Sequence, residues 1–183
     1  PFSREGNSSV SMNLAASRPA DWLQSGLVDD VTSNLLRELL SRSAERVLAE
    51  NAALWLSSGE FLDPILGSGP HAGHFVGEFH QPLDRGIISY VFASGQPVCE
   101  NAIADNPQHS PLLDQRLGIK TDAMIAVPLV VNGEMAGVIT CVHTRPADSA
   151  NPPSKFHSKD LEEFEFAAAC LGRLFEASLL NAG

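Results

Sequence analysis

The chain has 183 residues, 44% of them hydrophobic and 19% charged, enough for one domain and a short extension at roughly 150 residues per domain. Its formal net charge of -10 argues against a nucleic-acid-binding surface, because phosphate binding relies on clustered Lys and Arg. The cysteines, Cys99, Cys141 and Cys170, are too few for a disulfide-bonded secreted domain, and no apolar run approaches the roughly 20 residues that span a bilayer. We therefore expect a cytoplasmic protein that neither binds nucleic acid nor inserts into a membrane.

The N-terminal part of the chain predicts an arm followed by a helix. Residues 1–20 are rich in Ser, Asn, Ala and Pro and show no sustained period, so we expect a mobile arm over 1–27. A helix is predicted over about 28–46, because apolar residues recur at helical spacing and two aspartates stand near its start. The apolar positions that define it are Val28, Val31, Leu35, Leu39, Val47 and Leu48.

The middle of the chain alternates short apolar runs with glycine and proline. Two such runs, 52–56 and 61–66, each end in Gly and Ser and predict a hairpin. After them the pattern predicts a helix over 87–94 that is closed by Gly95 and a short strand over 97–102. A short helix over 111–117, which ends at Gly118, follows.

The clearest strand signal is a pair of apolar runs, 123–131 and 134–143, joined by Asn132-Gly133. This dipeptide favours a tight type I′ turn, because both of its residues must adopt positive φ. A proline-rich loop and an amphipathic helix over about 158–180 follow, the helix with apolar positions at near-heptad spacing: Leu161, Phe164, Ala168, Leu171, Phe175 and Leu179. Strands that meet mostly through turns indicate an α+β fold with an antiparallel sheet.

Four segments resemble the GAF domain family of small-molecule sensors. Residues 84–98 are similar to the segment in which a glycine opens a helix and Ser-Gly-Gln-Pro-Val leads into a strand, and 124–129 are similar to a strand that ends in Val-Pro-Leu. The Asn-Gly hairpin over 132–139 and the helix start over 156–161 complete the set. The resemblance implies one domain over 28–181, with a central antiparallel sheet of five or six strands flanked by helices on both faces. It also implies long terminal helices that pair in a homodimer and connect to an output domain elsewhere on a longer chain.

The resemblance leaves the ligand and any cofactor unassigned. Members that bind tetrapyrroles carry a Cys-His dipeptide, which this sequence lacks. Members that bind cyclic nucleotides have Asn-Lys followed by Phe-x-x-x-Asp-Glu; here Phe156 and Asp160 are kept, but Leu161 replaces the Glu and His143-Thr144 replaces Asn-Lys. Phe156 is more simply a core residue and Asp160 a carboxylate at a helix start.

Free-methionine-sulfoxide reductases share this fold and use several cysteines in the pocket, including an activated thiolate and a resolving thiol. The segment 103–118, where the resemblance places a catalytic cysteine, contains none, and 140–142 lack the expected acidic residue. A redox enzyme is therefore the function that we favour least, after a small-molecule sensor and a dimerisation module. We assign no catalytic residue and expect no enzyme.

Histidines do not form a metal motif in this sequence. His71, His74 and His80 lie in a Gly/Pro-rich region without fixed helical spacing, so we interpret them as loop residues and assign no metal ligand. Cys141 and His143 share one side of a strand by its period of two. In one interpretation both side chains face the pocket as a pair of ligands. In the other, which we favour, Cys141 is a core residue and His143 lies at the end of the strand.

A pocket is predicted between the sheet and the two inserted helices. The candidate lining residues are Phe92, Cys99, Leu113, Met124 and Cys141. The alternative is that these side chains fill a closed core. With a pocket, the domain senses a small molecule and transmits a conformational signal; without one, it is a dimerisation module that acts through its terminal helices.

Overall fold

The structure is a computed structural model that describes residues 18–150 and 154–182. Its longest elements are two helices, α1 (Asp30–Arg46) and α4 (Ser158–Asn181), and a hairpin of two long strands, β5 (Ile119–Val131) and β6 (Glu134–Pro146). The shorter elements are β1 (Asn51–Ser57), β2 (Phe61–Ser68), β3 (Gln81–Pro82), α2 (Ile87–Ser94), β4 (Val98–Glu100) and α3 (Leu112–Leu117), with 3-10 turns at Pro19–Asp21, Ala72–His74 and Ile103–Asp105. The elements predicted from the sequence are confirmed.

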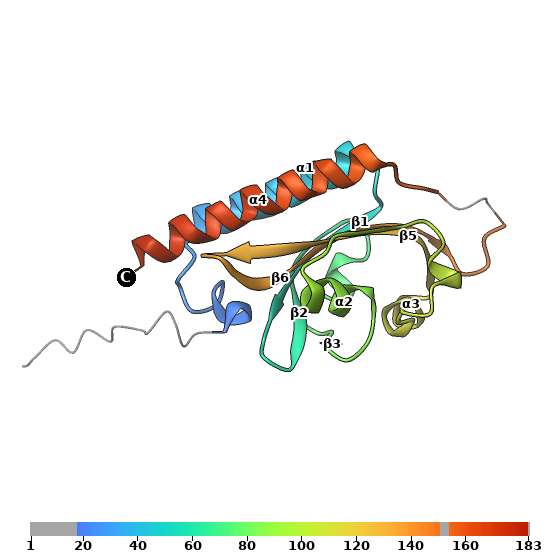
Figure 1. Cartoon of the computed structure of the whole chain (residues 1–183), viewed down its shortest axis with the longest axis horizontal. Coiled ribbons are helices and arrows are strands. Elements are labelled where there is room, and N and C mark those ends of the chain that lie inside the picture. The colour runs from blue at the N-terminus through green and yellow to red at the C-terminus, as the bar shows by residue number, and fades with distance from the viewer. Residues whose placement is uncertain (1–17, 151–153, 183) are drawn as a thin grey trace, which may run out of the picture.

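Within the described residues the sheet has six strands in the order β3-β2-β1-β6-β5-β4, and each neighbouring pair is antiparallel (Figure 1). The predicted turn joins its two longest strands, with φ of 52° at Asn132 and 81° at Gly133. The last strand, β6, lies between β1 and β5 and so occupies the middle of the sheet. The α+β fold with helices on both faces is confirmed.

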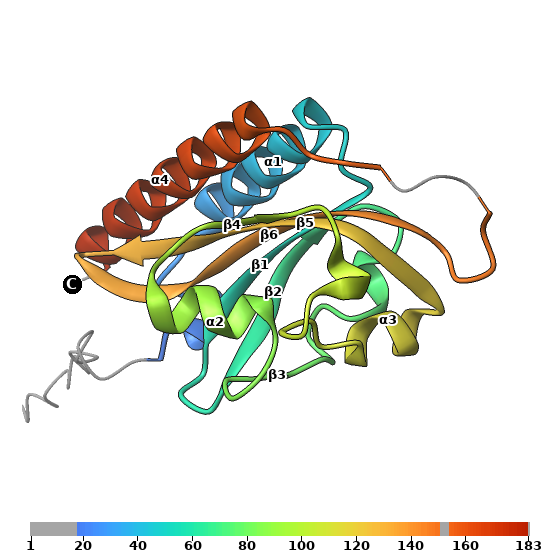
Figure 2. The same ribbon diagram turned by 45° about the vertical axis from the view of Figure 1, so that its right-hand side comes forward.

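Two helical layers cover the sheet (Figure 2). The long helices α1 and α4 lie side by side on one face, over a core that includes Leu54, Ile125 and Ile139. The short helices α2 and α3 lie on the other face, over a second core that includes Trp55 and Met124. Consecutive residues of one strand, such as Leu54 and Trp55, therefore pack into the cores on opposite faces of the sheet, as the two-residue period of a strand requires.

The helix α4 packs closely on β5. The predicted apolar positions Phe164, Leu171 and Phe175 are all buried against the sheet. A Cβ at Gly172 would lie 2.6 Å from the carbonyl oxygen of Val130, so the helix can approach this strand only with glycine there. The near-heptad series is therefore used within the domain and does not form an exposed seam.

The buried face of α1 differs only in part from the predicted one, because Val28 and Val47 at its two ends are buried and Leu39 packs against the core. Val31 and Leu35 are 70% and 50% exposed, whereas Leu36 and Leu40 are buried between α4 and the sheet. Two apolar rows run along this helix, and helical periodicity alone does not select the row that faces the core. Leu48, which was also expected in the apolar series, is exposed just after the helix end.

The packed part of the domain begins before Val28. Residues 1–17 of the predicted arm lie outside the described residues, but 18–27 lie against the domain. Trp22 is buried, with its ring centroid 5.5 Å from that of Phe175 near the end of α4. The sequence did not single out Trp22 as a core residue, because the short apolar run Trp22-Leu23 shows neither a helical nor a strand period.

Candidate ligand-binding site

A cavity of about 70 Å³ lies between the sheet and the layer that contains α2 and α3. Its floor is formed by β1, β5 and β6, and three segments far apart in the sequence close it: the turn after β2, the start of α2, and the stretch from the 3-10 turn Ile103–Asp105 to α3. The principal lining residues are Asn51, Ala53, Trp55, His71, Phe75, Gln81, Gly86, Ile87, Ile88, His109, Ser110, Leu113, Asp114, Leu117, Thr121, Met124, Thr140, Val142 and Thr144.

Part of the cavity wall is apolar and rigidly packed. Trp55 and Phe75 stack with ring centroids 6.0 Å apart and an interplanar angle of 16°. The indole N–H of Trp55 donates to Thr140 Oγ1 over 3.0 Å, which satisfies the one polar atom of this buried ring. The wall beside these rings is therefore hydrophobic and has a fixed shape.

A charged group in the lining, Asp114, has its hydrogen bonds made within the protein. Its carboxylate accepts bonds from the backbone N–H and the hydroxyl of Thr121, at 2.9 and 2.7 Å, and its Oδ2 lies 3.5 Å from His109 Nε2. Burial works to raise the pKa of Asp114, but the bonds from His109 and Thr121 outweigh burial, and the net pKa is lowered. Asp114 is thus an ionised group that anchors α3 to the first residues of β5.

Ser110 stands out among the polar residues of the lining. Its Oγ is buried and has no hydrogen-bond partner, which is true of no other buried side-chain nitrogen or oxygen in residues 18–150 and 154–182. Gly86, the residue before α2, lies beside it: a Cβ built there would be 3.3 Å from Ser110 Cβ and 2.9 Å from Gln81 Nε2. Gly86 also has a φ of +96°, which favours glycine for conformational as well as for steric reasons.

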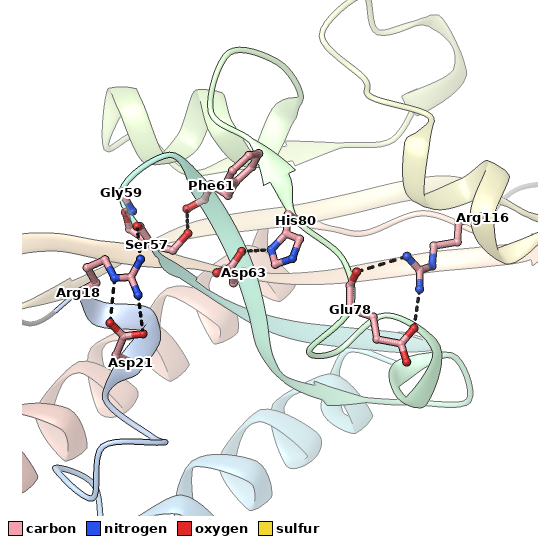
Figure 3. A network of polar contacts seen from close by, with 10 residues as sticks. Arg18, Asp21, Ser57, Gly59, Phe61, Asp63, Glu78, His80 and Arg116 are labelled. Carbon is pink, nitrogen blue, oxygen red and sulfur yellow. Dashed lines mark hydrogen bonds and ion pairs between the residues drawn. The ribbon is translucent and has the colours of Figure 1, made fainter.

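Two of the closing segments are joined by an ion pair. Arg116 on α3 contacts Glu78, which follows the turn Ala72–His74, through Nη2 at 2.6 Å from Oε2 and through Nη1 at 3.4 Å from the Glu78 carbonyl (Figure 3). A hollow on the outside of this pair shares His71 and Leu117 with the cavity lining. The Glu78–Arg116 pair therefore lies next to residues of the cavity lining and ties together two of the segments that close it.

The structure brings only some of the predicted lining residues to the cavity. Leu113 and Met124 line it. Phe92 packs into the same core but outside the lining, whereas Cys99 and Cys141 pack with the layer of the long helices. The period of a strand predicts that neighbouring residues point to opposite faces of the sheet, but it does not predict which face Cys141 takes. As a lining residue Cys141 was expected on the cavity face, and it lies on the face covered by the long helices.

Burial works against reactivity of these two thiols. Burial, and then the charges of Asp160 and Glu100, raise the pKa of Cys99, and burial raises that of Cys141 far above its usual range. His143 also faces the long helices, where its ring stacks on Phe156 and its Nδ1 lies 2.9 Å from Glu50 Oε2. The interpretation of Cys141 as a core thiol is therefore confirmed, but the placement of His143 at the strand end is wrong, because β6 continues to Pro146 and His143 is buried within it.

Several lining residues were not singled out from the sequence. Asn51 donates to Thr144 Oγ1 and accepts the backbone N–H of His71, so it fixes the start of the segment that closes one side of the cavity. His109 and Ser110 lie in an irregular loop where no periodicity operates. The only available signal for them was their place just before a predicted short helix.

No group of three or more His, Cys, Asp or Glu side chains among the described residues is arranged to hold a metal ion. Within the same residues, no helix combines the length and the apolar character needed to cross a bilayer.

Solved structures share the fold over nearly the whole chain. The GAF domain of a phosphoenolpyruvate-protein phosphotransferase from Coxiella burnetii has a TM-score of 0.68 and 14% identity, covering 94% of this chain and 98% of that one. Free methionine-R-sulfoxide reductase from Neisseria meningitidis has a TM-score of 0.65 and 19% identity, covering 99% of this chain and 97% of that one. The GAF-B domain of DevS from Mycobacterium smegmatis has a TM-score of 0.61 and 14% identity, covering 82% of this chain and 96% of that one. At these identities the likeness shows the fold alone.

No curated protein matches the chain in sequence. The GAF domain family does match, over residues 32–173, which is well over half of the chain. The sequence motifs, the sheet order and this match agree, and the chain belongs to the GAF domain family.

Proposed function

We propose that this chain is a sensory domain of a signal-transduction protein that binds a small molecule in the cavity between the sheet and α2–α3. The observation that carries the proposal is the cavity itself, closed by three segments far apart in the sequence and lined by hydrophobic side chains with a few polar groups. This is the usual composition of a small-molecule site. The output domain is carried elsewhere, on a longer chain or a partner, and the free cysteines suit a cytoplasmic setting.

The proposed role is regulatory and not catalytic. The placement of Cys99 and Cys141 away from the cavity supports this, as does the raised pKa of both thiols, because the thiolate is the nucleophile in cysteine chemistry. The reductases of this fold use cysteines in the pocket, and among the described residues that line this cavity none is a cysteine.

A thermal-shift screen of metabolites tests ligand binding. A compound at 100 times its Kd stabilises the folded state by about 2.7 kcal/mol, which is easily measured as a rise in Tm. The cavity variant Ala53→Leu adds volume at a lining position, and Ala93→Leu adds the same volume at an exposed position of α2. We expect stabilisation of the wild type and of Ala93→Leu but not of Ala53→Leu. No stabilising compound across a broad library would contradict the proposal.

Dimerisation through the terminal helices is a second proposal, and a different observation favours it. Large apolar side chains are exposed on both long helices: Val31 and Leu35 on α1, and Phe166 and Leu180 on α4, the last two at 68% and 78% exposure. Exposed apolar residues of this size on adjacent helices favour a protein contact.

Light scattering after size-exclusion chromatography tests the dimer. We expect the wild type to elute as a dimer and Phe166→Glu as a monomer, because a carboxylate would be buried unpaired in the contact. Tyr90→Glu changes an exposed aromatic residue on the opposite layer and should leave the dimer intact. A monomeric wild type at high protein concentration would count against this second role.

A further inference from the structure

Building on the proposed ligand-binding function, we propose that the cavity takes a small uncharged molecule, largely apolar, whose single hydrogen-bonding group pairs with Ser110. Alcohols and ketones of four or five carbons are the chemical class that fits. The inference depends on three features of the cavity: one buried polar atom without a partner, the absence of any free charge in its wall, and its size.

The unpartnered atom is Ser110 Oγ. A hydroxyl buried without a hydrogen bond destabilises the folded state, so such atoms are rare and call for an explanation. Ser110 lies in the cavity lining, and Gly86 packs closely beside it, since a Cβ there would come within 3.3 Å of Ser110 Cβ. A ligand hydroxyl or carbonyl that reaches Ser110 Oγ from the cavity would supply the missing bond.

The charge of the wall excludes ionic ligands. None of the described lining residues is Lys or Arg, so a phosphate or carboxylate would find no ammonium or guanidinium group, and of the two lining histidines, His71 and His109, the second already lies next to Asp114. The carboxylate in the lining, Asp114, would repel an anion, and its oxygens already accept bonds from Thr121 and lie next to His109, so it offers little to a cation. Burying an unpaired ion costs much more than burying a neutral group with one hydrogen bond.

The size of the cavity sets the size of the molecule. One water needs about 10 to 15 Å³ of such space. The observed 70 Å³ therefore holds on the order of five or six non-hydrogen atoms without any movement of the wall. Pockets for drug-sized ligands occupy about 300 Å³ or more, so a nucleotide, which is of that size, would not fit without movement of the wall.

Methionine methyl NMR can test this directly on the wild-type protein. The chain has three methionines: Met124 lines the cavity, Met135 lies at the other end of α2 beside Gly95, and Met12 is outside the described residues. We expect 1-butanol and 2-butanone to shift the Met124 methyl signal in a saturable way and to leave Met135 unchanged. Butyrate and butylamine have nearly the same shape but carry a charge, and they should leave both signals unchanged.

Ser110→Ala tests the named contact, with Ser154→Ala at an exposed serine as the matched control. A neutral hydrogen bond contributes about 0.5 to 1.5 kcal/mol, so Ser110→Ala should weaken 1-butanol binding by about two- to twelvefold. Unchanged affinity in Ser110→Ala would overturn the contact. Binding of butyrate or butylamine as tight as that of 1-butanol would overturn the ligand class while leaving the sensory function standing. The sensory function fails separately, if the broad library stabilises nothing.

Discussion

The ring of His143 lies almost parallel to that of Phe156, with centroids 4.1 Å apart and an interplanar angle of 20°. His143 belongs to β6, and Phe156 stands two residues before α4. The backbone of Phe156 is fixed further by Asn101, whose side chain accepts its N–H over 2.8 Å and donates to its carbonyl over 3.0 Å. This stacked pair therefore attaches the start of α4 to the middle of the sheet.

Loss of the Phe156 ring should destabilise the whole domain. Phe156 is buried, and replacing a buried Phe by Ala costs about 3 to 5 kcal/mol. We expect Phe156→Ala to lower the free energy of unfolding in urea by about this amount. Tyr90→Ala removes an exposed ring on the opposite layer, away from the proposed dimer contact, and should change it by no more than about 0.5 kcal/mol. Equal effects of the two substitutions would contradict the anchoring role of Phe156.

Breaking the Glu78–Arg116 ion pair should loosen the segments that close the cavity without unfolding the domain. The two side chains are 66% and 40% exposed, and an exposed pair contributes about 1 kcal/mol or less. Arg116→Gln should therefore leave global stability nearly unchanged. It should speed amide hydrogen exchange in 71–80 and in α3, because both segments lose their mutual tether.

Arg42→Gln is the matched control for this ion pair. It breaks a pair within α1, and hydrogen exchange around the cavity should be unaffected. Unchanged exchange in Arg116→Gln would show that the pair does not hold the closing segments together.

The carboxylate of Asp114 should make stability depend on pH. Since the pKa of Asp114 is lowered in the folded state, its contribution is present in full above the unfolded pKa of about 4 and is lost as pH falls through the folded pKa. Hydrogen bonds to a charged group contribute about 1.5 to 3 kcal/mol, so we expect Asp114→Asn to be destabilised by about this amount at pH 7.

The difference in unfolding free energy between Asp114→Asn and the wild type should shrink as pH falls below about 4, because the carboxyl is protonated first in the unfolded state and only at lower pH in the folded state. Urea unfolding at a series of pH values measures this. Asp105→Asn, at an exposed position, serves as the control and should stay close to the wild type at every pH. A difference for Asp114→Asn that does not vary with pH would rule out ionisation as its source.

The buried thiol of Cys141 should resist alkylation. Because burial raises its pKa, the reactive thiolate is scarce, and the side chain is fully enclosed. Iodoacetamide should modify the partly exposed Cys170 in the native protein but reach Cys141 only in urea, as peptide mass spectrometry would show. Rapid labelling of native Cys141, or turnover of free methionine sulfoxide, would reopen the redox interpretation.

The sequence predicted the elements of the fold better than their orientation. Asn132-Gly133 and Gly95 mark turns by backbone conformation, a local property, and both positions are as expected. The direction in which α1 faces is not local. Its two apolar rows, one with Leu35 and one with Leu36, are similar in the sequence, and only contact with α4 and the sheet distinguishes them.

The same reasoning explains the partial success with the cavity. Met124 and Leu113 were expected there because a pocket was placed under the inserted helices. Ser110 and His109 belong to a loop whose path depends on tertiary contacts, such as the bonds between Asp114 and Thr121. A pattern of hydrophobicity along the chain contains no information about such contacts.

The position of β6 has a mechanical consequence for the domain. Thr140, Val142 and Thr144 line the cavity, while Cys141 and His143, between them, face the long helices. The floor of the cavity and the base beneath α4 are thus a single layer of backbone. Any displacement of this stretch of strand by an occupant moves both at once, with no intervening loop or hinge.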